Sequence, residues 1–326
     1  MGDVAARVGV SRQLVSLVFR NMPGASDATR ARVLEVAEEL GYRPDTAAQV
    51  LRRARSGHVG VLFTLRHPHD ASIVEAIYPA AERVGYDIAL GASGPGRDER
   101  KAVESLLAYR IEALIVIGPY VTPDKLATLA RQIPVVEISR PSDVSGVDSV
   151  RTDDHLGVHL AVEHLHALGH RAIVHVDGGD MPGAEDRRSG YRTAMQTLGL
   201  DSDIRVVPAG YTEEAGARAA RQLMTDGTLP TAIVAGNDRC AIGLIGTFTR
   251  RGINVPGDIS IVGYDDSQPA GLSYVDLTSV RQDATQLAEA AITAVSERLD
   301  QGRDTSTDIV LEPRLVVRGT TAAPRL

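Results

Sequence analysis

The sequence predicts an α/β protein with two parts, a small all-α N-terminal region and a larger body of two doubly wound parallel sheets. Residues 1–56 contain short helical patterns separated by glycine and polar turns. From residue 58 onward, almost wholly apolar strand-like runs alternate with amphipathic helical patterns. This alternation is typical of parallel sheets covered by helices on both faces. The strand-like runs are too numerous for one sheet of ordinary size, so we expect two.

The first twenty residues predict two short helices joined by a tight turn. A helix is expected over residues 3–8, where apolar residues recur at helical spacing. Gly9 should end it, because glycine readily adopts the positive φ of a tight turn. Ser11 is a good N-cap for the second helix. The inner face of that helix is formed by three apolar residues, Leu14, Val15 and Val18. This arrangement is a helix-turn-helix.

The start of the second helix carries polar side chains suited to reading DNA. In a helix-turn-helix these positions reach the major groove. Arg12 can form two hydrogen bonds to guanine and Gln13 can do the same with adenine, while Ser16 lies one turn later. The alternative is a plain pair of helices with exposed polar residues.

A third helix is expected after Ser26, its N-cap, and should end at Gly41 with Pro44 just beyond. Its inward residues are predicted to be Val33, Leu34, Ala37 and Leu40. Residues 45–56 then form a short helix-capable run with arginines at its end.

Several short motifs of this region occur together: Asp3 to Ala5, Gly9 to Ser11, Val15-Ser16, Asn21, Ser26 to Arg30, Leu40 to Pro44, Ala47-Ala48, Leu51 and Arg55-Ser56. In this combination the chain resembles the LacI/GalR family of bacterial transcription regulators. The resemblance implies a DNA-binding headpiece of three helices plus a hinge helix, together residues 1–57.

The resemblance also implies which residues contact DNA: Ser11, Arg12, Gln13, Ser16, Asn21, Thr29, Arg30, Ala48 and Leu51. Leu51 would enter the minor groove at the operator centre, where an apolar wedge unstacks and kinks a base step. Two positions depart from the family pattern. Leu17 stands where many members carry a base-reading arginine, and Asp45 replaces the asparagine that usually begins the hinge helix.

Charge is distributed unevenly along the chain. Residues 1–57 contain nine arginines against six acidic residues, a net charge of +3, whereas the whole chain carries −7 and the remainder therefore −10. A basic head on an acidic body suits a protein that binds DNA with one part only. The single cysteine, Cys240, allows no internal disulfide, and no apolar run is long enough to span a membrane. We expect a cytoplasmic protein.

In the body, the apolar runs predict strands over residues 59–64, 87–90, 113–117, 134–138, 171–176, 231–235 and 259–262. Helices are expected over residues 72–84, 98–108, 123–131, 155–168, 185–198, 213–224 and 239–251. Pro79 should kink or split the first of these helices.

The family resemblance extends through the body, in motifs that include Leu168 to Arg171, Arg187 to Tyr191, Asn237-Asp238, Ser260 to Asp266 and Leu277 to Gln282. It implies a periplasmic-binding-protein-like, effector-binding body over residues 58–326. One subdomain would comprise about 58–169 plus 283–311 and the other about 170–282 plus 312–326. The crossings are expected near Gly169, Gln282 and Glu312.

Ligands of such sheets bind at the carboxyl ends of the strands, which here would frame a cleft between subdomains. Arg187, Asn237, Asp238 and Asp265 follow strands of the second subdomain and match effector positions of the family. Carboxylates and amides bind sugar hydroxyls, and arginine can bridge two oxygens. For Asp238 the alternative is a helix cap.

Further candidate effector contacts are Tyr211, which matches a stacking aromatic in relatives, and four residues of the first subdomain: Asp70, Ser72, Tyr120 and Asp153. For Tyr211 the alternative is a half-buried loop aromatic. Because aromatic residues make up only 4% of the chain, we favour a carbohydrate effector over a purine.

Other functions have little support in the sequence. His155 and His159 are spaced one helical turn apart, but no metal-binding motif accompanies them, so a solvated helix face is the simpler interpretation. No cofactor loop and no nucleophile–base pair indicate an enzyme. We therefore expect a homodimeric repressor that binds a pseudo-palindromic operator and responds to a small molecule. The alternative is a solute-binding protein with the same body, which would not explain residues 1–57.

Overall fold

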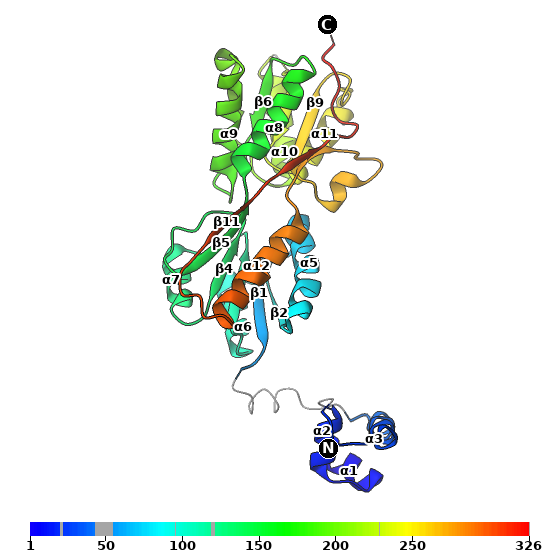
Figure 1. The fold of residues 1–326 in the computed structure, drawn as a ribbon. Coiled ribbons are helices and arrows are strands. Elements are labelled where there is room, and N and C mark those ends of the chain that lie inside the picture. The colour runs from blue at the N-terminus through cyan, green and yellow to red at the C-terminus, as the bar shows by residue number, and fades with distance from the viewer. Residues whose placement is uncertain (20–21, 43–54, 95, 119–120, 228, 326) are drawn as a thin grey trace. The chain divides into compact units, whose positions relative to one another are not determined.

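The computed structural model describes residues 1–19, 22–42, 55–94, 96–118, 121–227 and 229–325 (Figure 1). The chain divides into two compact units, Met1–Ser56 and Gly57–Leu326. We refer to the second unit as the body. Proposed hinge residues between 43 and 54 lie outside the described part.

The described part of the first unit contains three helices: α1 (Gly2–Val8), α2 (Arg12–Phe19) and α3 (Asp27–Glu39). Gly9 ends α1 with a φ of 77°, as its freedom from a side chain allows. The Ser11 hydroxyl accepts a hydrogen bond from the Leu14 amide at 3.1 Å, and the Ser26 hydroxyl accepts one from the Thr29 amide at 3.2 Å. The predicted helix starts and the glycine stop are confirmed.

The core of this unit is narrower than predicted. Val33, Val36 and Ala37 of α3 are buried against α1 and α2, whereas Leu34 is 47% exposed and Leu40 is 42% exposed. The prediction that both leucines face inward is wrong. Three short helices bury only the stripe at positions i, i+3 and i+4, and Leu34 lies beside that stripe.

The body contains two six-stranded sheets, with orders β11-β5-β4-β3-β1-β2 and β12-β10-β9-β8-β6-β7. All pairs of the first sheet are parallel, and β12 is the one antiparallel strand of the second. The strands are β1 (His58–Thr64), β2 (Asp87–Ser93), β3 (Ala113–Ile117), β4 (Val135–Ile138), β5 (Val147–Thr152), β6 (Ile173–Val176), β7 (Arg205–Val207), β8 (Ala232–Ala235), β9 (Ser260–Asp265), β10 (Thr278–Arg281), β11 (Asp308–Leu311) and β12 (Arg314–Val316). We call the regions built on these sheets the first and second lobes.

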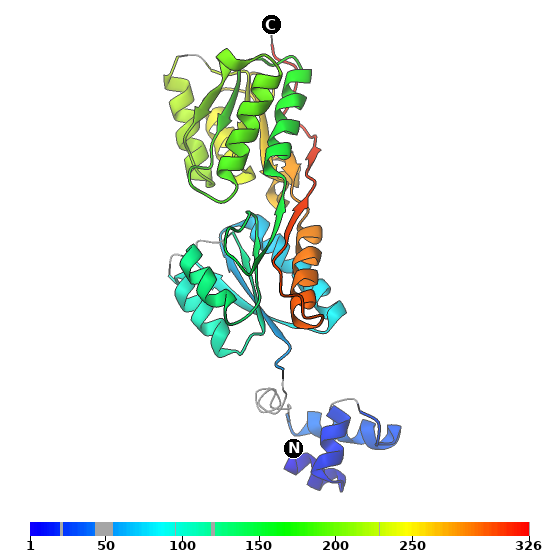
Figure 2. The same ribbon diagram turned by 60° about the vertical axis from the view of Figure 1, so that its left-hand side comes forward.

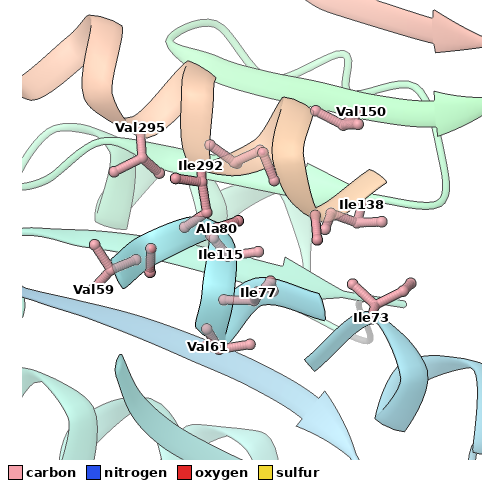
Figure 3. Close-up of a cluster of buried hydrophobic side chains, with 14 of the residues drawn as sticks. Val59, Val61, Ile73, Ile77, Ala80, Ile115, Ile138, Val150, Ile292 and Val295 are labelled. Atoms are coloured by element: carbon pink, nitrogen blue, oxygen red, sulfur yellow. The ribbon is translucent and has the colours of Figure 1, made fainter. Parts of the chain in front are cut away.

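Helices cover both faces of each sheet (Figure 2). They are α5 (Pro68–Val84), α6 (Glu99–Ala108), α7 (Pro123–Ala130), α8 (Asp154–Ala167), α9 (Ala184–Thr197), α10 (Glu213–Thr225), α11 (Asp238–Arg250) and α12 (Ala284–Leu299), with 3₁₀ turns η1 (Asp201–Asp203) and η2 (Gln268–Gly271). In the first lobe, α5 and α12 pack on one face of the sheet, where side chains such as Ile77 and Ile292 meet Ile115 of the central strand (Figure 3).

The chain first passes from the first lobe to the second between β5, a strand of the first sheet, and α8. Val158, Ala161 and Leu165 of α8 are buried against the second sheet. The expected crossing near Gly169 is therefore wrong, because the apolar face of α8 belongs to the core of the second lobe. The chain passes between the sheets again from β10 to α12 and from β11 to β12.

The alternation of strands and helices in the body is confirmed, with two kinds of difference. The prediction did not identify the strands β5, β7, β10, β11 and β12 or the helix α12. Each of these strands contains charged or polar residues that interrupt the apolar run by which the other strands were found. The helix α5 begins at Pro68, and Pro79 does not split it. Pro79 is exposed, so the backbone carbonyl that loses its partner can be solvated.

Candidate functional site

A small polar cavity of about 40 Å³ lies between the two lobes of the body. The first lobe lines it with Thr64, His67, His69, Asp70, Gly118 and Ser139. The second lobe contributes Met181, Pro182, Arg187, Tyr211, Asn237 and Asp265, and Gln282 lies in the segment that connects the lobes. Five of the predicted effector residues are thus brought together: Asp70, Arg187, Tyr211, Asn237 and Asp265.

Arg187 is the most heavily engaged of these residues. It lies on α9 and is only 4% exposed. Its Nε donates to Asp154 Oδ1 at 3.0 Å, and one terminal nitrogen donates to the Gly236 carbonyl at 2.7 Å. The guanidinium also stacks 3.8 Å from the centre of the Tyr264 ring. Arg187 therefore holds α8, α9 and the end of β8 together, in addition to facing the cavity.

Asp265 closes the cavity at the end of β9. Its Oδ1 accepts a hydrogen bond from Gln282 Nε2 at 2.8 Å and lies 4.0 Å from the Arg187 guanidinium. Its φ is 109°, and Ser139 across the cavity has a φ of 90°. Such backbone strain in residues with a side chain costs stability and is concentrated at functional sites.

Tyr211 is buried against glycine. A Cβ atom at Gly178 would lie 2.2 Å from its ring, and one at Gly236 would lie 3.0 Å away, so both glycines make room for the ring. The Tyr211 hydroxyl donates to the Pro182 carbonyl at 3.2 Å, and the Arg187 guanidinium lies 5.3 Å from the ring centre. With 6% of the residue exposed, little of the ring is offered to a bound molecule in this conformation.

Asp70 and His69 face the cavity from the first turn of α5. Asp70 Oδ2 accepts a hydrogen bond from the Thr64 amide at 3.2 Å. Burial, with a smaller contribution from the charge of Asp265, raises the pKa of Asp70 to about 8. His69 is 7% exposed and its buried Nε2 has no hydrogen-bond partner. Burial lowers the pKa of His69, so its ring is neutral at pH 7.

Asn237 and Asp238 have different roles at the start of α11. Asn237 caps the helix by accepting from the Cys240 amide at 2.9 Å, and its Nδ2 donates to the Tyr211 carbonyl at 3.4 Å. Asp238 is completely buried and does not line the cavity. Its carboxyl accepts from Ser267 and Ser279, and burial raises its pKa to about 8.

Two further predicted effector residues, Ser72 and Asp153, do not line the cavity. The Ser72 hydroxyl donates to the Pro68 carbonyl at 3.2 Å, and Asp153 caps α8 by accepting from the Leu156 amide at 2.9 Å. Tyr120 lies outside the described residues.

The prediction missed the other eight residues that line the cavity: Thr64, His67, His69, Gly118, Ser139, Met181, Pro182 and Gln282. Ser139 directly follows β4 and Gln282 directly follows β10, so the strand-end argument could have found both.

At the other candidate site, Ser11, Arg12 and Gln13 are exposed at the start of α2, and Ser16 is half-buried. Arg30 of α3 donates to the carbonyls of Val18 and Met22, at 3.3 and 2.9 Å, and so ties α3 to the end of α2. Thr29 exchanges a hydrogen bond with Ser26 at 2.9 Å. Asn21, Ala48 and Leu51 fall outside the described part of the chain.

Within the described ranges, no group of three or more histidine, cysteine or acidic side chains is placed to hold a metal ion. None of the helices described is both long and apolar enough to cross a membrane.

Comparison with known proteins gives matches over nearly the whole chain. Residues 1–45 match the family "Bacterial regulatory proteins, lacI family", and residues 162–321 match the "Periplasmic binding protein-like domain". The chain is 33% identical to the transcriptional regulator GalR of Escherichia coli K12 over 99% of its own length and 96% of that protein.

Two solved structures extend this comparison. A LacI transcriptional regulator from a Rhodococcus species is 45% identical, with a TM-score of 0.80, over 82% of this chain and 98% of that one. The lac repressor dimer bound to operator and the anti-inducer ONPF is 28% identical, with a TM-score of 0.82, over 98% of both chains. The similarities in both units show that this chain belongs to the LacI family of bacterial regulatory proteins, which bind DNA and regulate transcription in response to a ligand.

Proposed function

We propose that this protein is a transcriptional repressor, and not an enzyme, whose affinity for an operator changes when a small molecule binds the cavity between the lobes. The observation that carries the proposal is the exposed start of α2, with Arg12 and Gln13 side by side on a compact three-helix unit. A solute-binding protein would have no use for such a unit. Since its target would be chromosomal DNA, the protein would act in the cytoplasm.

On the DNA side, Arg12, Gln13 and Ser16 would contact base edges in the major groove, while Ser11 would both cap α2 and face the phosphate backbone. Thr29 and Arg30 would position the unit, with Arg30 doing so mainly through its bonds to the end of α2. Leu51 of the hinge would act as the minor-groove wedge, and Asn21 and Ala48 would also contact DNA. A homodimer would place two such units on a pseudo-palindromic operator, as in the operator-bound lac repressor dimer.

On the effector side, the cavity must enlarge before it can hold a ligand. Its volume of about 40 Å³ is that of one or two water molecules, whereas small-molecule sites usually measure roughly 300–1,000 Å³. Effector binding would therefore separate the lobes and stabilise a different relative orientation of the two. This change in orientation would alter the affinity for the operator. Asp70, Asn237 and Asp265 would contact a carbohydrate. Arg187 and Tyr211, which also line the cavity, would hold its wall in place and contact the ligand once the cavity enlarges.

The proposal is tested by selecting sequences from a random DNA library with the full-length protein and with residues 58–326 alone. We expect the full chain to enrich a two-fold symmetric sequence and the truncated chain to enrich none. Thermal unfolding of the truncated chain provides the control that its body is intact. Enrichment of the same sequence by both proteins would overturn the proposal.

A further inference from the structure

The effector cavity contains more acidic than basic groups. Two carboxyl groups, Asp70 and Asp265, line it, and two more, Asp154 and Asp238, lie just behind its wall. Arg187 is the one arginine or lysine among the lining residues that the structure describes. Because Arg187 already donates to Asp154 at 3.0 Å, it could not balance the charges of Asp70 and Asp265 if both carboxyl groups were ionised.

Asp265 is the centre of this acidic group. Its charge acts on Asp70 and Asp238, raising the pKa of both beyond the effect of burial. One oxygen of Asp70 lies 3.7 Å from His67 Nδ1, which is longer than a hydrogen bond, and burial lowers the pKa of His67. Neither neighbouring histidine therefore carries a positive charge at neutral pH that would stabilise the carboxylate form of Asp70 beside Asp265.

His69 provides an independent indication that a ligand group is missing. Its Nε2 is buried without a hydrogen-bond partner in a residue that is 93% buried and lines the cavity. Leaving such an atom unpaired costs about 1–3 kcal/mol. A hydroxyl group of a bound molecule would satisfy it.

We propose that the effector is an amino sugar, whose protonated amine binds between Asp70 and Asp265 and whose hydroxyl groups bond with His69 and Asn237. The inference rests on the proposed function only in taking this cavity as the effector site. The cation is assigned as organic because no group of side chains in the described ranges is placed to hold a metal ion.

Binding of the amine would release a proton. At pH 7 the carboxyl of Asp70, with its pKa near 8, is mostly protonated in the ligand-free protein. An ammonium group beside it favours the carboxylate, so Asp70 loses its proton to the buffer while the ammonium keeps all of its own. A neutral sugar would leave the proton on Asp70.

The experiment is isothermal titration calorimetry of the full-length protein with D-glucosamine, D-galactosamine and D-mannosamine. Each is compared with its parent hexose and its N-acetyl derivative, which keep the ring but lose the charge. We expect one amine to bind at least about tenfold more tightly than both of its matched neutral sugars, the size of one charge-assisted hydrogen bond. Titrations in two buffers of different ionisation enthalpy should show release of about one proton or slightly less.

A parent hexose or N-acetyl sugar that binds as tightly as the amine would overturn the inference, as would failure of all three amines to bind. Operator selection is measured on the same preparation. If selection persists while the amines fail, only the ligand class is wrong. If selection is also absent, the proposed function itself fails.

The variant Asp70→Asn tests the assigned residue, with Asp87→Asn as a matched control at an exposed position of the same lobe. Asp70→Asn should abolish both the tenfold preference for the amine and the proton release, whereas Asp87→Asn should change neither. Retention of both by Asp70→Asn would overturn the assignment.

The same variant has a readout that needs no ligand. In the folded protein Asp70 keeps a proton that the unfolded chain loses near its ordinary pKa of 3.8, so the contribution of Asp70 to stability falls as pH rises from about 4 to about 8. Asp70→Asn should make the pH dependence of the melting temperature shallower in that range. An unchanged pH dependence would show that the pKa of Asp70 is not raised in the folded protein, and this would contradict the inference.

Discussion

Arg12 and Arg187 present the same side chain under opposite conditions. Arg12 is exposed at the start of α2, whereas Arg187 is 4% exposed and bonded to Asp154 and Gly236. When an exposed guanidinium binds a phosphate or a base, the main free-energy cost is the conformational entropy that its side chain loses. Salt weakens such binding. A buried guanidinium that already has partners contributes mainly by holding the walls of a site in place.

The two regions also carry opposite charge. Residues 1–57 have a net charge of +3, while carboxyl groups predominate around the cavity between the lobes. A polyanion suits the first region and a cationic or hydroxyl-rich molecule suits the second. One chain can therefore bind two dissimilar partners without competition between the sites, because each site repels the partner of the other.

The largest effect is expected from Arg187→Ala. Its removal would leave Asp154 buried without its charge partner, so we expect the free energy of unfolding of the body to fall by about 3–5 kcal/mol. Arg192→Ala, an exposed position on the same helix, should change it by less than about 0.5 kcal/mol. Chemical denaturation of both variants measures the difference. A small loss in Arg187→Ala would mean that this arginine serves ligand binding alone.

An intermediate effect is expected from Arg12→Ala. Loss of two hydrogen bonds to one base should cost about 1–3 kcal/mol in binding to the selected operator and relax the preference at one base pair of each half-site. Fluorescence anisotropy with operator variants at several salt concentrations measures both quantities, while the stability of the protein should hardly change. Equal weakening on every DNA sequence, with a smaller salt slope, would identify Arg12 as a phosphate contact instead.

The smallest effects are expected from helix caps, one in each unit. Ser26→Ala removes the cap of α3 and Asp98→Ala removes that of α6, where Asp98 Oδ1 accepts from the Lys101 amide at 2.9 Å. Each should cost about 1 kcal/mol in its own unit and nothing in the other. Residue-resolved hydrogen exchange measures the loss of stability in each unit separately. Equal loss of protection in both units after either change would show that they unfold together.

Local sequence determined the elements themselves. Gly9 and Ser26 mark helix ends because their preferred backbone and hydrogen-bonding chemistry act within a few residues, and both positions are confirmed. The positions of Asn237 and Asp265 at strand ends could be predicted for the same reason, since parallel strands bring their carboxyl ends to one edge.

The tertiary structure alone decided which lobe an element joins and which polar groups remain available. The apolar face of α8 fits either sheet by its pattern, and only packing assigns it to the second. Asp238 and Asp265 follow strands alike, yet Ser267 and Ser279 bury the first while the second faces the cavity. Burial, hydrogen-bond partners and pKa depend on residues distant in the chain, so neither the acidic excess nor the unpaired His69 is visible in local sequence.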